Sequence, residues 1–290
     1  MLHCIILSMS QETYIETKYR KDLKTASHLL YQKGLTAGYD GNLSLKINNE
    51  MILVTPTHSH KGLIEENDFI EMDLNGNIIS NGRTMPSCVP TTDLTIHLEA
   101  YKKRSDIKAL IHAHPPTVVS LTTGGIEINQ PVIPGVILTL GEIATVSYLG
   151  QDRKIECDLT TQYLDNHDAI VLDRHGAVTV GKDIYDALYK MEFLEYVAKI
   201  IYQSHTLGEI KTLDGKEIKQ GFRFKDLFKR FFESDSPVFQ RILNLANELM
   251  LTTLKKTTYS QKLSNEEREQ LSKEITASLF GMILGKCTKK

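Results

Sequence analysis

Two histidines close a short apolar run, and they are the first residues of this sequence whose types and spacing could do chemistry. The run is residues 108–111, and His112 and His114 follow with one residue between them. If the run is a strand, residues i and i+2 point to the same face, so the two imidazoles lie side by side. Two neutral imidazoles held in this way suit a divalent transition metal. The H-x-H pattern is weak by itself, so the site needs ligands from elsewhere in the chain.

Two other residues could supply those ligands. His175 follows the apolar run 169–172 and precedes a glycine, which predicts a place at a strand end on the same edge of the sheet. Asp93 opens a predicted helix that leads directly into the H-x-H strand. Three histidines and a carboxylate without a thiolate favour zinc, although Mn, Fe and Co accept the same donors. A carboxylate that leaves the metal when substrate arrives would also be free to act as a base.

Polar loops near these residues are suited to an anion. Thr91 and Thr92 stand at the predicted helix start, where free N–H groups and the helix dipole favour phosphate. Either threonine is also a natural N-cap, and capping alone is the more common role. Asn42, in the G-N-x-S stretch 41–44, and Thr57 belong to two further loops that could close around the same group.

The elements that must position these residues follow from hydrophobic periodicity and from turn residues. Helices are predicted for 11–33, for the residues after 90–93, for the polar stretch that ends at Asp165, and for 182–202. Strands are predicted around 43–47, 51–56, 69–73, 78–79, 108–111, 169–172 and 177–181, with a hairpin turn at Asn75-Gly76. Gly34 is expected just beyond the end of the first helix. The order of these elements predicts an α/β or α+β architecture.

Composition excludes several classes of protein. The four cysteines are scattered without a C-x-x-C pair, so neither a disulfide framework nor a cysteine zinc site is expected, and a reducing, cytoplasmic compartment fits. No stretch approaches the roughly 20 apolar residues of a membrane span. The first residues form too short an apolar run, without basic residues before it, for a signal peptide, and Met9 is an alternative start to Met1.

Charge divides the chain into two parts. Residues 211–290 carry a net charge of +6 and residues 1–210 a net charge of −8. We predict a catalytic domain over 1–210 and a helical, basic C-terminal extension over 211–290. The segment 222–232 mixes aromatic and basic residues, as a nucleic-acid or membrane-binding surface would. Acidic residues interleave with them, which favours a packed helix or a subunit contact instead.

The same residues, taken in order, resemble a known family. Gly41-Asn42-x-Ser44, Thr55-Pro56-Thr57, Pro90-Thr91-Thr92-Asp93 with His97 and Tyr101, His112-x-His114 and His175-Gly176 follow the pattern of class II, zinc-dependent aldolases of the aldolase/adducin family. The resemblance covers about residues 15–207. This family includes fuculose-phosphate and rhamnulose-phosphate aldolases, ribulose-phosphate 4-epimerase and methylthioribulose-phosphate dehydratase.

The resemblance implies a class II aldolase-like central β-sheet flanked by helices, and a homotetramer with active sites between subunits. His112, His114 and His175 match the zinc ligands. Asn42, Thr57, Thr91 and Thr92 match positions that contact the phosphate of a phosphorylated sugar. Asp93 matches the catalytic acid/base, which is a glutamate in the aldolases. The implied activity is that of a lyase that cleaves or forms the C–C bond of a ketose 1-phosphate through a metal-stabilised enediolate.

The sequence departs from the family pattern at three places, and the third, Asp93, keeps other reactions open. Thr-Thr replaces the usual Ser-Ser, and His58 stands where a glycine is common. Asp93 resembles the aspartate of the 4-epimerase, so an epimerase or a dehydratase is an alternative. The proton donor is unassigned, with Glu142 and Tyr148 as candidates that are more often surface and packing residues. A non-catalytic, adducin-like scaffold is disfavoured because all three histidines are retained. Among the other histidines, His97 is expected to be a packed core residue.

Overall fold

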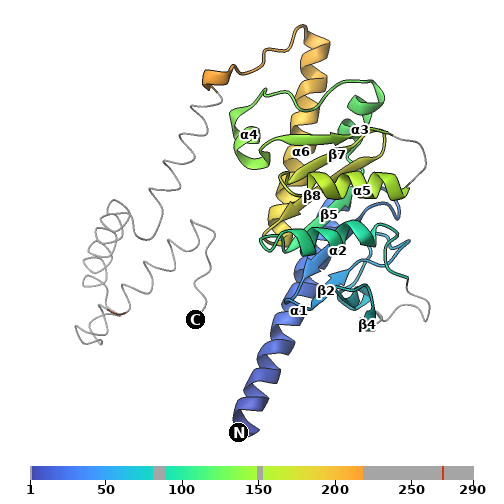
Figure 1. Cartoon of the computed structure of the whole chain (residues 1–290), viewed down its shortest axis with the longest axis vertical. Coiled ribbons are helices and arrows are strands. Elements are labelled where there is room, and N and C mark those ends of the chain that lie inside the picture. The colour runs from blue at the N-terminus through green and yellow to red at the C-terminus, as the bar shows by residue number, and fades with distance from the viewer. Residues whose placement is uncertain (1, 81–88, 149–152, 218–269, 271–290) are drawn as a thin grey trace. The chain divides into compact units, whose positions relative to one another are not determined.

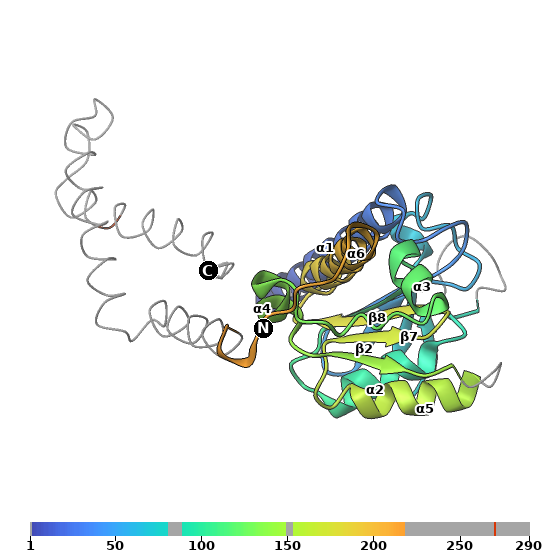
Figure 2. The same cartoon turned by 90° about the horizontal axis from the view of Figure 1, so that it is seen from above.

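A computed structural model describes residues 2–80, 89–148, 153–217 and 270. Residues 1–218 form one compact unit. Within it, a single sheet is covered by helices on both faces (Figures 1 and 2). The strands of this sheet are β1 (Asn42–Lys46), β2 (Met51–Val54), β3 (Ile70–Asp73), β4 (Ile78–Ser80), β5 (Ala109–Ala113), β6 (Ile143–Val146), β7 (Ala169–Leu172) and β8 (Gly176–Gly181). The helices are α1 (Leu2–Gln32), α2 (Leu94–Lys103), α3 (Pro116–Thr123), α4 (Pro134–Leu140), α5 (Arg153–Tyr163) and α6 (Ile184–Leu207).

The histidine-bearing strand lies in the middle of the sheet. The strand order is β4-β3-β2-β1-β5-β8-β7-β6, and every neighbouring pair is antiparallel except β6 and β7. His112 on β5 is therefore flanked on both sides, by Asn42 of β1 and by Val178 of β8. The expected central sheet with flanking helices is confirmed.

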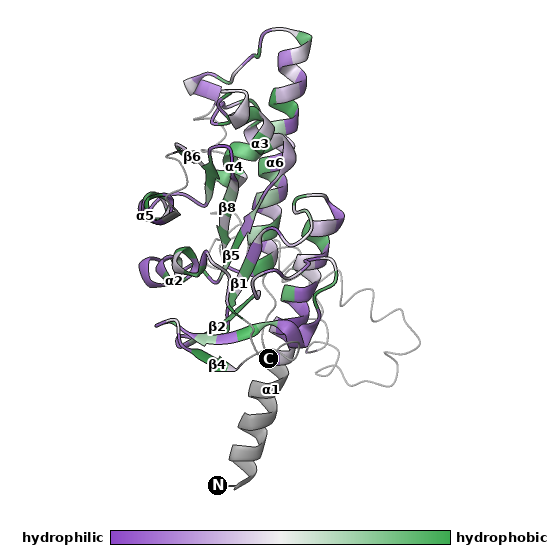
Figure 3. Ribbon diagram, turned by 90° about the vertical axis from the view of Figure 1, so that its right-hand side faces the viewer, coloured by the Kyte–Doolittle hydropathy of each residue, from purple (hydrophilic) through white to green (hydrophobic). Residues whose placement is uncertain are grey.

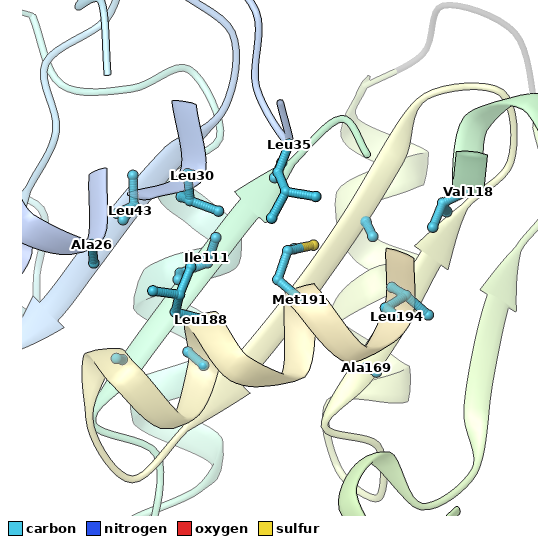
Figure 4. Packing of buried hydrophobic residues seen from close by; sticks show 14 of the residues in the cluster. Ala26, Leu30, Leu35, Leu43, Ile111, Val118, Ala169, Leu188, Met191 and Leu194 are labelled. Carbon is cyan, nitrogen blue, oxygen red and sulfur yellow. The ribbon is translucent and has the colours of Figure 1, made fainter. Parts of the chain in front are cut away.

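The two faces of the sheet are covered by different helices. In Figure 2, α1 and α6 lie over one face and α2 and α5 over the other. Leu30 of α1 and Met191 of α6 belong to the core on the first face, where they pack near Ile111 of β5 (Figure 4). Leu110, the neighbour of Ile111, belongs to the core under α2 because successive strand residues point to opposite faces.

This alternation decides where the polar residues of the central strands lie. Leu43 and Leu45 of β1 belong to the α1–α6 face, so Asn42 and Ser44 point to the α2 face, and so does His112 on β5. All strand positions of β1 and β5 are buried, and Figure 3 shows hydrophobic residues along the central strands and hydrophilic ones on the outer sides of α2 and α5. A group of buried polar side chains is thus enclosed between the sheet and α2.

Most predicted elements are confirmed. The first helix ends at Gln32, and Gly34 has the left-handed backbone expected beyond it (φ +69°). The helix begins at Leu2, nine residues earlier than predicted. The two hairpins, β1–β2 and β3–β4, form as expected. The strand β5 stops at Ala113, before the two prolines, as expected. Helix α3 is an addition to the prediction: Pro116 occupies its first turn, where the missing N–H costs nothing.

The start of α2 corrects one prediction. Neither Thr91 nor Thr92 is its N-cap, because the helix begins at Leu94 and Asp93 occupies the N-cap position. The hydroxyl of Thr91 instead accepts a hydrogen bond from the backbone N–H of Asp93 at 3.3 Å, in the turn before the helix. The N–H of Leu94 also donates to the carbonyl of Thr91 at 3.2 Å, so a turn precedes the regular helix.

The predicted C-terminal extension lies outside the described residues, apart from residues 211–217 and Gln270. The boundary at residue 210 therefore stays a prediction. Helix α6 ends at Leu207, followed by Gly208. Within the described part of the chain, no helix combines the length and the hydropathy that a membrane span needs.

Candidate metal centre

Three imidazoles converge at one end of the central strands. His112 is on β5, His114 follows the last residue of that strand, and His175 lies in the turn between β7 and β8. The three ring centroids are 4.9, 4.9 and 5.0 Å apart. One ligand nitrogen from each ring lies within 4.8 Å of the others. The prediction that His175 reaches the H-x-H pair is confirmed, because β8 lies next to β5 in the sheet.

Each imidazole has its Nδ1 close to an oxygen that can only accept a hydrogen bond. The partners are the carbonyl of Ala177 for His112 at 3.1 Å, Asp40 Oδ2 for His114 at 3.3 Å, and Glu156 Oε1 for His175 at 3.0 Å. In the neutral rings, Nδ1 must therefore carry the proton, and Nε2 keeps its lone pair. Metal-binding histidines are typically oriented in this way, with the second nitrogen bonded to a carboxylate or a carbonyl.

Burial keeps two of these rings neutral. Desolvation lowers the pKa of His112 well below its ordinary value, and the neighbouring imidazoles act in the same direction. Burial is also the main cause that lowers the pKa of His114. Neutral imidazole is the form that binds a metal. At neutral pH, His112 and His114 can therefore bind a metal without first losing a proton.

The spacing of the nitrogens fits a divalent metal. The Nε2 atoms of His112 and His114 are 3.1 Å apart. Because both atoms present lone pairs, this approach is repulsive unless a cation lies between them. Two histidine ligands of a tetrahedral zinc ion, at about 2.0–2.1 Å from the metal, lie about 3.3–3.4 Å from each other. The donor set therefore fits a zinc-like ion.

Two glycines allow the backbone to approach this group closely. A Cβ on Gly176 would lie 2.4 Å from the carbonyl oxygen of Ala113 and 2.7 Å from the ring of His114. A Cβ on Gly41, whose φ is +72°, would lie 2.8 Å from the carbonyl oxygen of His112. Both positions need glycine, since the carbonyl oxygens of Ala113 and His112 cannot move without displacing the H-x-H segment.

A cavity of about 370 Å³ opens onto the three histidines. All eight site residues predicted from the sequence line it: Asn42, Thr57, Thr91, Thr92, Asp93, His112, His114 and His175. The loops that carry Thr57 and Thr91 are joined because the N–H of Thr57 donates to the carbonyl of Val89 at 2.9 Å. The roles of these residues in substrate binding and catalysis stay predictions.

Asp93 lies beside the histidine group. Its Oδ2 is 3.9 Å from Nε2 of His112 and accepts a hydrogen bond from Nδ2 of Asn42 at 2.8 Å. The carboxylate is mostly buried, with 18% of its side chain exposed. It is thus placed to face both a metal at the three Nε2 atoms and a molecule in the cavity.

The other sequence candidates fall elsewhere. Glu142 and Tyr148 are exposed and do not line this cavity, and Tyr148 packs under the guanidinium of Arg174 at 4.2 Å. His97 is fully buried, as expected for a core histidine. His58 does line the cavity and has a positive φ of 54°.

Sequence reasoning missed Asp40 and Glu156, the carboxylates that orient His114 and His175. Asp40 could have been proposed from the sequence, since it stands in the same polar loop as Asn42. Glu156 carries no such signal, because it is one of two acidic residues in a polar helix that has no visible link to the histidines.

Comparison with known proteins agrees with this geometry. Residues 21–202 match the family model of the class II aldolase and adducin N-terminal domain. An L-fuculose phosphate aldolase from Methanocaldococcus jannaschii is 37% identical over 171 residues, which are 59% of this chain and 88% of that protein. A 3-oxo-tetronate 4-phosphate decarboxylase from Haemophilus influenzae is 29% identical over 194 residues, covering 65% of this chain and 85% of the relative.

A solved structure shows the same fold. YgbL from Escherichia coli superimposes with a TM-score of 0.64 at 26% identity, covering 71% of this chain and 98% of YgbL. The matched family region, residues 21–202, contains the three histidines, Asp93 and every other residue that lines the cavity. The chain therefore belongs to the class II aldolase and adducin N-terminal domain family.

Proposed function

We propose that this chain is a zinc-dependent lyase that cleaves or forms the C–C bond of a ketose 1-phosphate. One observation carries the proposal: one nitrogen from each of three imidazoles converges at a cavity that also presents the carboxylate of Asp93. The relatives named above act on phosphorylated sugars or sugar acids, which supports the substrate class.

His112, His114 and His175 would hold the metal. When bound, a divalent ion supplies Lewis-acid stabilisation of the negative charge that develops on a carbonyl oxygen as a neighbouring C–C bond breaks. The protein contributes a prearranged donor set, since the Nδ1 partners already fix each ring.

Asp93 would move the proton. Its carboxylate faces the cavity and lies 3.9 Å from Nε2 of His112, so a substrate hydroxyl held near the histidines is within its reach. As a base it would accept the hydroxyl proton during cleavage, and as an acid it would return that proton in the reverse direction.

The hydroxyls of Thr57, Thr91 and Thr92 would bind the phosphate. They line the cavity from two loops that are joined by the hydrogen bond between Thr57 and Val89. Hydroxyl and backbone N–H donors suit a phosphate dianion, and about 370 Å³ is within the range of small-ligand sites. Asn42 also lines the cavity, although its amide already bonds to Asp93.

Decarboxylation is the second candidate, because the relative from Haemophilus influenzae is named for it. Decarboxylation also breaks a C–C bond beside a carbonyl and needs the same charge stabilisation. Epimerisation at C4 and dehydration use related sites, so the fold does not separate these reactions.

Metal analysis tests the first step. The purified protein should contain about one equivalent of zinc per chain, and the His112→Ala variant should contain almost none. His205→Ala is the matched control, since His205 is exposed on α6 and far along the chain from the three ligands. Full metal content in His112→Ala would overturn the site.

Product analysis tests the reaction. The protein should release dihydroxyacetone phosphate from one of a panel of pentulose and deoxyhexulose 1-phosphates. Release of carbon dioxide from a 3-oxo acid phosphate would instead establish the decarboxylase, and inversion at C4 without cleavage the epimerase.

We also propose a homotetramer, on the resemblance alone. Light scattering should give four chains per particle. If residues 211–290 are a separate module, a chain cut after residue 210 should keep its metal. Loss of the tetramer on truncation would assign an assembly role to that segment.

A further inference from the structure

A chain of buried hydrogen bonds leads away from Asp93 into the space between β1 and α2. Asn42 Nδ2 donates to Asp93 Oδ2 at 2.8 Å, and Asn42 Oδ1 is 2.6 Å from His97 Nε2. On the other side of the ring, His97 Nδ1 is 2.6 Å from Ser44 Oγ. Ser44 Oγ is in turn 2.5 Å from the hydroxyl of Tyr101.

The chemistry of the groups allows only one donor-to-acceptor direction along this series of hydrogen bonds. A carboxylate only accepts, so the Asn42 amide must turn its NH₂ towards Asp93 and its oxygen towards His97. That oxygen also only accepts, so His97 must carry its proton on Nε2. Burial lowers the pKa of His97 to about 4, which keeps the ring neutral at neutral pH and makes Nδ1 an acceptor.

The hydroxyl groups complete the sequence. Ser44 donates its proton to Nδ1 of His97, and its oxygen is left to accept from Tyr101. Every donor therefore points along the chain towards Asp93. Reversing any one bond would set two donors or two acceptors against each other.

The burial of these four side chains makes the hydrogen-bond network rigid. Ser44 and His97 are fully inaccessible to solvent, Tyr101 is 3% exposed and Asn42 5% exposed. Around them lie apolar residues of the core under α2, including Leu110 and Val178. In such surroundings an unpaired polar group is costly, so the complete network has a single favourable arrangement.

We propose that His97 and Ser44 are positioning residues that hold the amide of Asn42, and through it the carboxylate of Asp93, in one orientation towards His112. This inference rests on the proposed function, because the role of Asp93 as acid/base belongs to that proposal. Neither residue lines the cavity, so both act through Asn42.

The carboxylate needs such support. Asp93 is in the turn before α2, at φ −94° and ψ 14°, and its side chain is on the cavity wall. A catalytic group must be held within a fraction of an ångström of its productive position. A fixed donor on one carboxylate oxygen limits rotation of the carboxylate, and His97 stops the donor itself from turning over.

Kinetics of a distant variant test this coupling. Ser44→Ala removes a hydroxyl that is separated from Asp93 by two residues of the network, His97 and Asn42. We expect kcat to fall about ten- to hundred-fold, as for other partners of active-site groups, while KM and metal content stay within twofold. Ser27→Ala is the matched control, because Ser27 is equally buried and hydrogen-bonded, to Leu23 in α1. Unchanged kcat in Ser44→Ala would overturn the proposal.

A pair of substitutions at His97 separates positioning from packing. Gln carries a donor and an acceptor about as far apart as the two imidazole nitrogens, whereas Leu fills similar space without either. His97→Gln should therefore retain most of kcat, and His97→Leu should lose at least as much as Ser44→Ala. Equal kcat in folded Gln and Leu variants would show that only packing matters and would overturn the proposal.

Nitrogen NMR gives a test that needs no substrate. In protein labelled with ¹⁵N-histidine, His97 should show a protonated Nε2 and an unprotonated Nδ1 at neutral pH, with the signals assigned by their absence in His97→Gln. In Asp93→Ala the Asn42 amide is free to turn over, so the other tautomer of His97 should appear. A protonated Nδ1 in the wild type, or an unchanged His97 spectrum in Asp93→Ala, would overturn the coupling. Absence of lyase activity in the wild type would overturn only the proposed function.

Discussion

Glu156 Oε1 lies 3.0 Å from Nδ1 of His175, so a residue of α5 orients a candidate metal ligand in the turn between β7 and β8. Helix α5 packs on β6 and β7, which places Glu156 over that turn. The carboxylate accepts the Nδ1 proton of the ring and so directs Nε2 towards the other two histidines.

Glu156→Gln should therefore weaken metal binding. The amide can still accept the proton of Nδ1 but carries no charge, so we expect the dissociation constant for zinc to rise about ten- to hundred-fold. Competition with a chromophoric chelator measures it. Glu99→Gln is the control, because Glu99 is paired with the exposed Lys102 on α2. Equal zinc affinity in the Glu156→Gln variant and the wild type would contradict this role.

Gly176→Ala should disrupt the same group through sterics alone. The new methyl group would lie 2.4 Å from the carbonyl oxygen of Ala113 and 2.7 Å from the ring of His114, so that ring must move. We expect loss of bound zinc and a fall of about 1–3 kcal/mol in the free energy of unfolding, as for other overpacked sites. Metal analysis and denaturant unfolding measure the two effects.

Gly135→Ala provides the comparison. Gly135 is in α4, and a Cβ there would meet no atom within 4 Å. Alanine should be neutral or slightly stabilising at this position, by about 0.5–1 kcal/mol. A Gly176→Ala protein that keeps its zinc would show that the H-x-H segment can shift without losing the site.

The three-histidine group could be predicted from the sequence because local rules determine it. His112 and His114 stand at the end of one apolar strand, and His175 stands just before another. Because β5 and β8 are antiparallel neighbours, the end of the first strand meets the start of the second. The hairpins and the first helix were predictable for a similar reason, since their turn residues lie beside them in the sequence.

The partners of these histidines depend on tertiary packing instead. Glu156 reaches His175 only because α5 crosses the sheet where it does, and no spacing in the sequence reports that crossing. The orientation of Asn42 likewise depends on α2 packing over β1, which brings His97 to its oxygen. The sequence places the start of α2 too early, because the hydroxyl of Thr91 makes a cap-like bond to the N–H of Asp93 while the regular helix begins only at Leu94.

His97 should make the stability of the fold depend on pH. Its pKa is about 4 in the folded chain because of burial and about 6.5 when unfolded. Between these values the unfolded chain binds a proton that the folded chain does not, so the free energy of unfolding falls as the pH is lowered. The full effect is about 3 kcal/mol.

Comparison with His97→Gln isolates this contribution, because glutamine does not titrate and the other histidines are common to both proteins. Urea unfolding of the metal-free proteins should show that, from pH 7 to pH 4, the free energy of unfolding falls by about 3 kcal/mol more in the wild type than in the variant. A constant difference between the two proteins would mean that the ring titrates normally, in conflict with its burial.

Glu195 of α6 should stabilise the start of α3, just after the H-x-H segment. Its carboxylate accepts hydrogen bonds from the N–H groups of Thr117 and Val118 at 3.0 and 3.2 Å and from the Thr117 hydroxyl at 2.6 Å. It is also a buried negative charge at the positive end of a helix. Glu195→Gln should lower the free energy of unfolding by about 2–3 kcal/mol, because bonds to a charged acceptor are replaced by weaker ones.

Glu192→Gln, on the same helix, is the control for that loss. Glu192 pairs with Lys33 at 3.1 Å, and both side chains are partly exposed, so its removal should cost less than about 1 kcal/mol. If Glu195 acts as a cap, Thr117→Val and Glu195→Gln should be non-additive, since the first removes the 2.6 Å bond that the second weakens. Additive effects in the double variant would assign the stability to packing around Glu195 rather than to its bonds with α3.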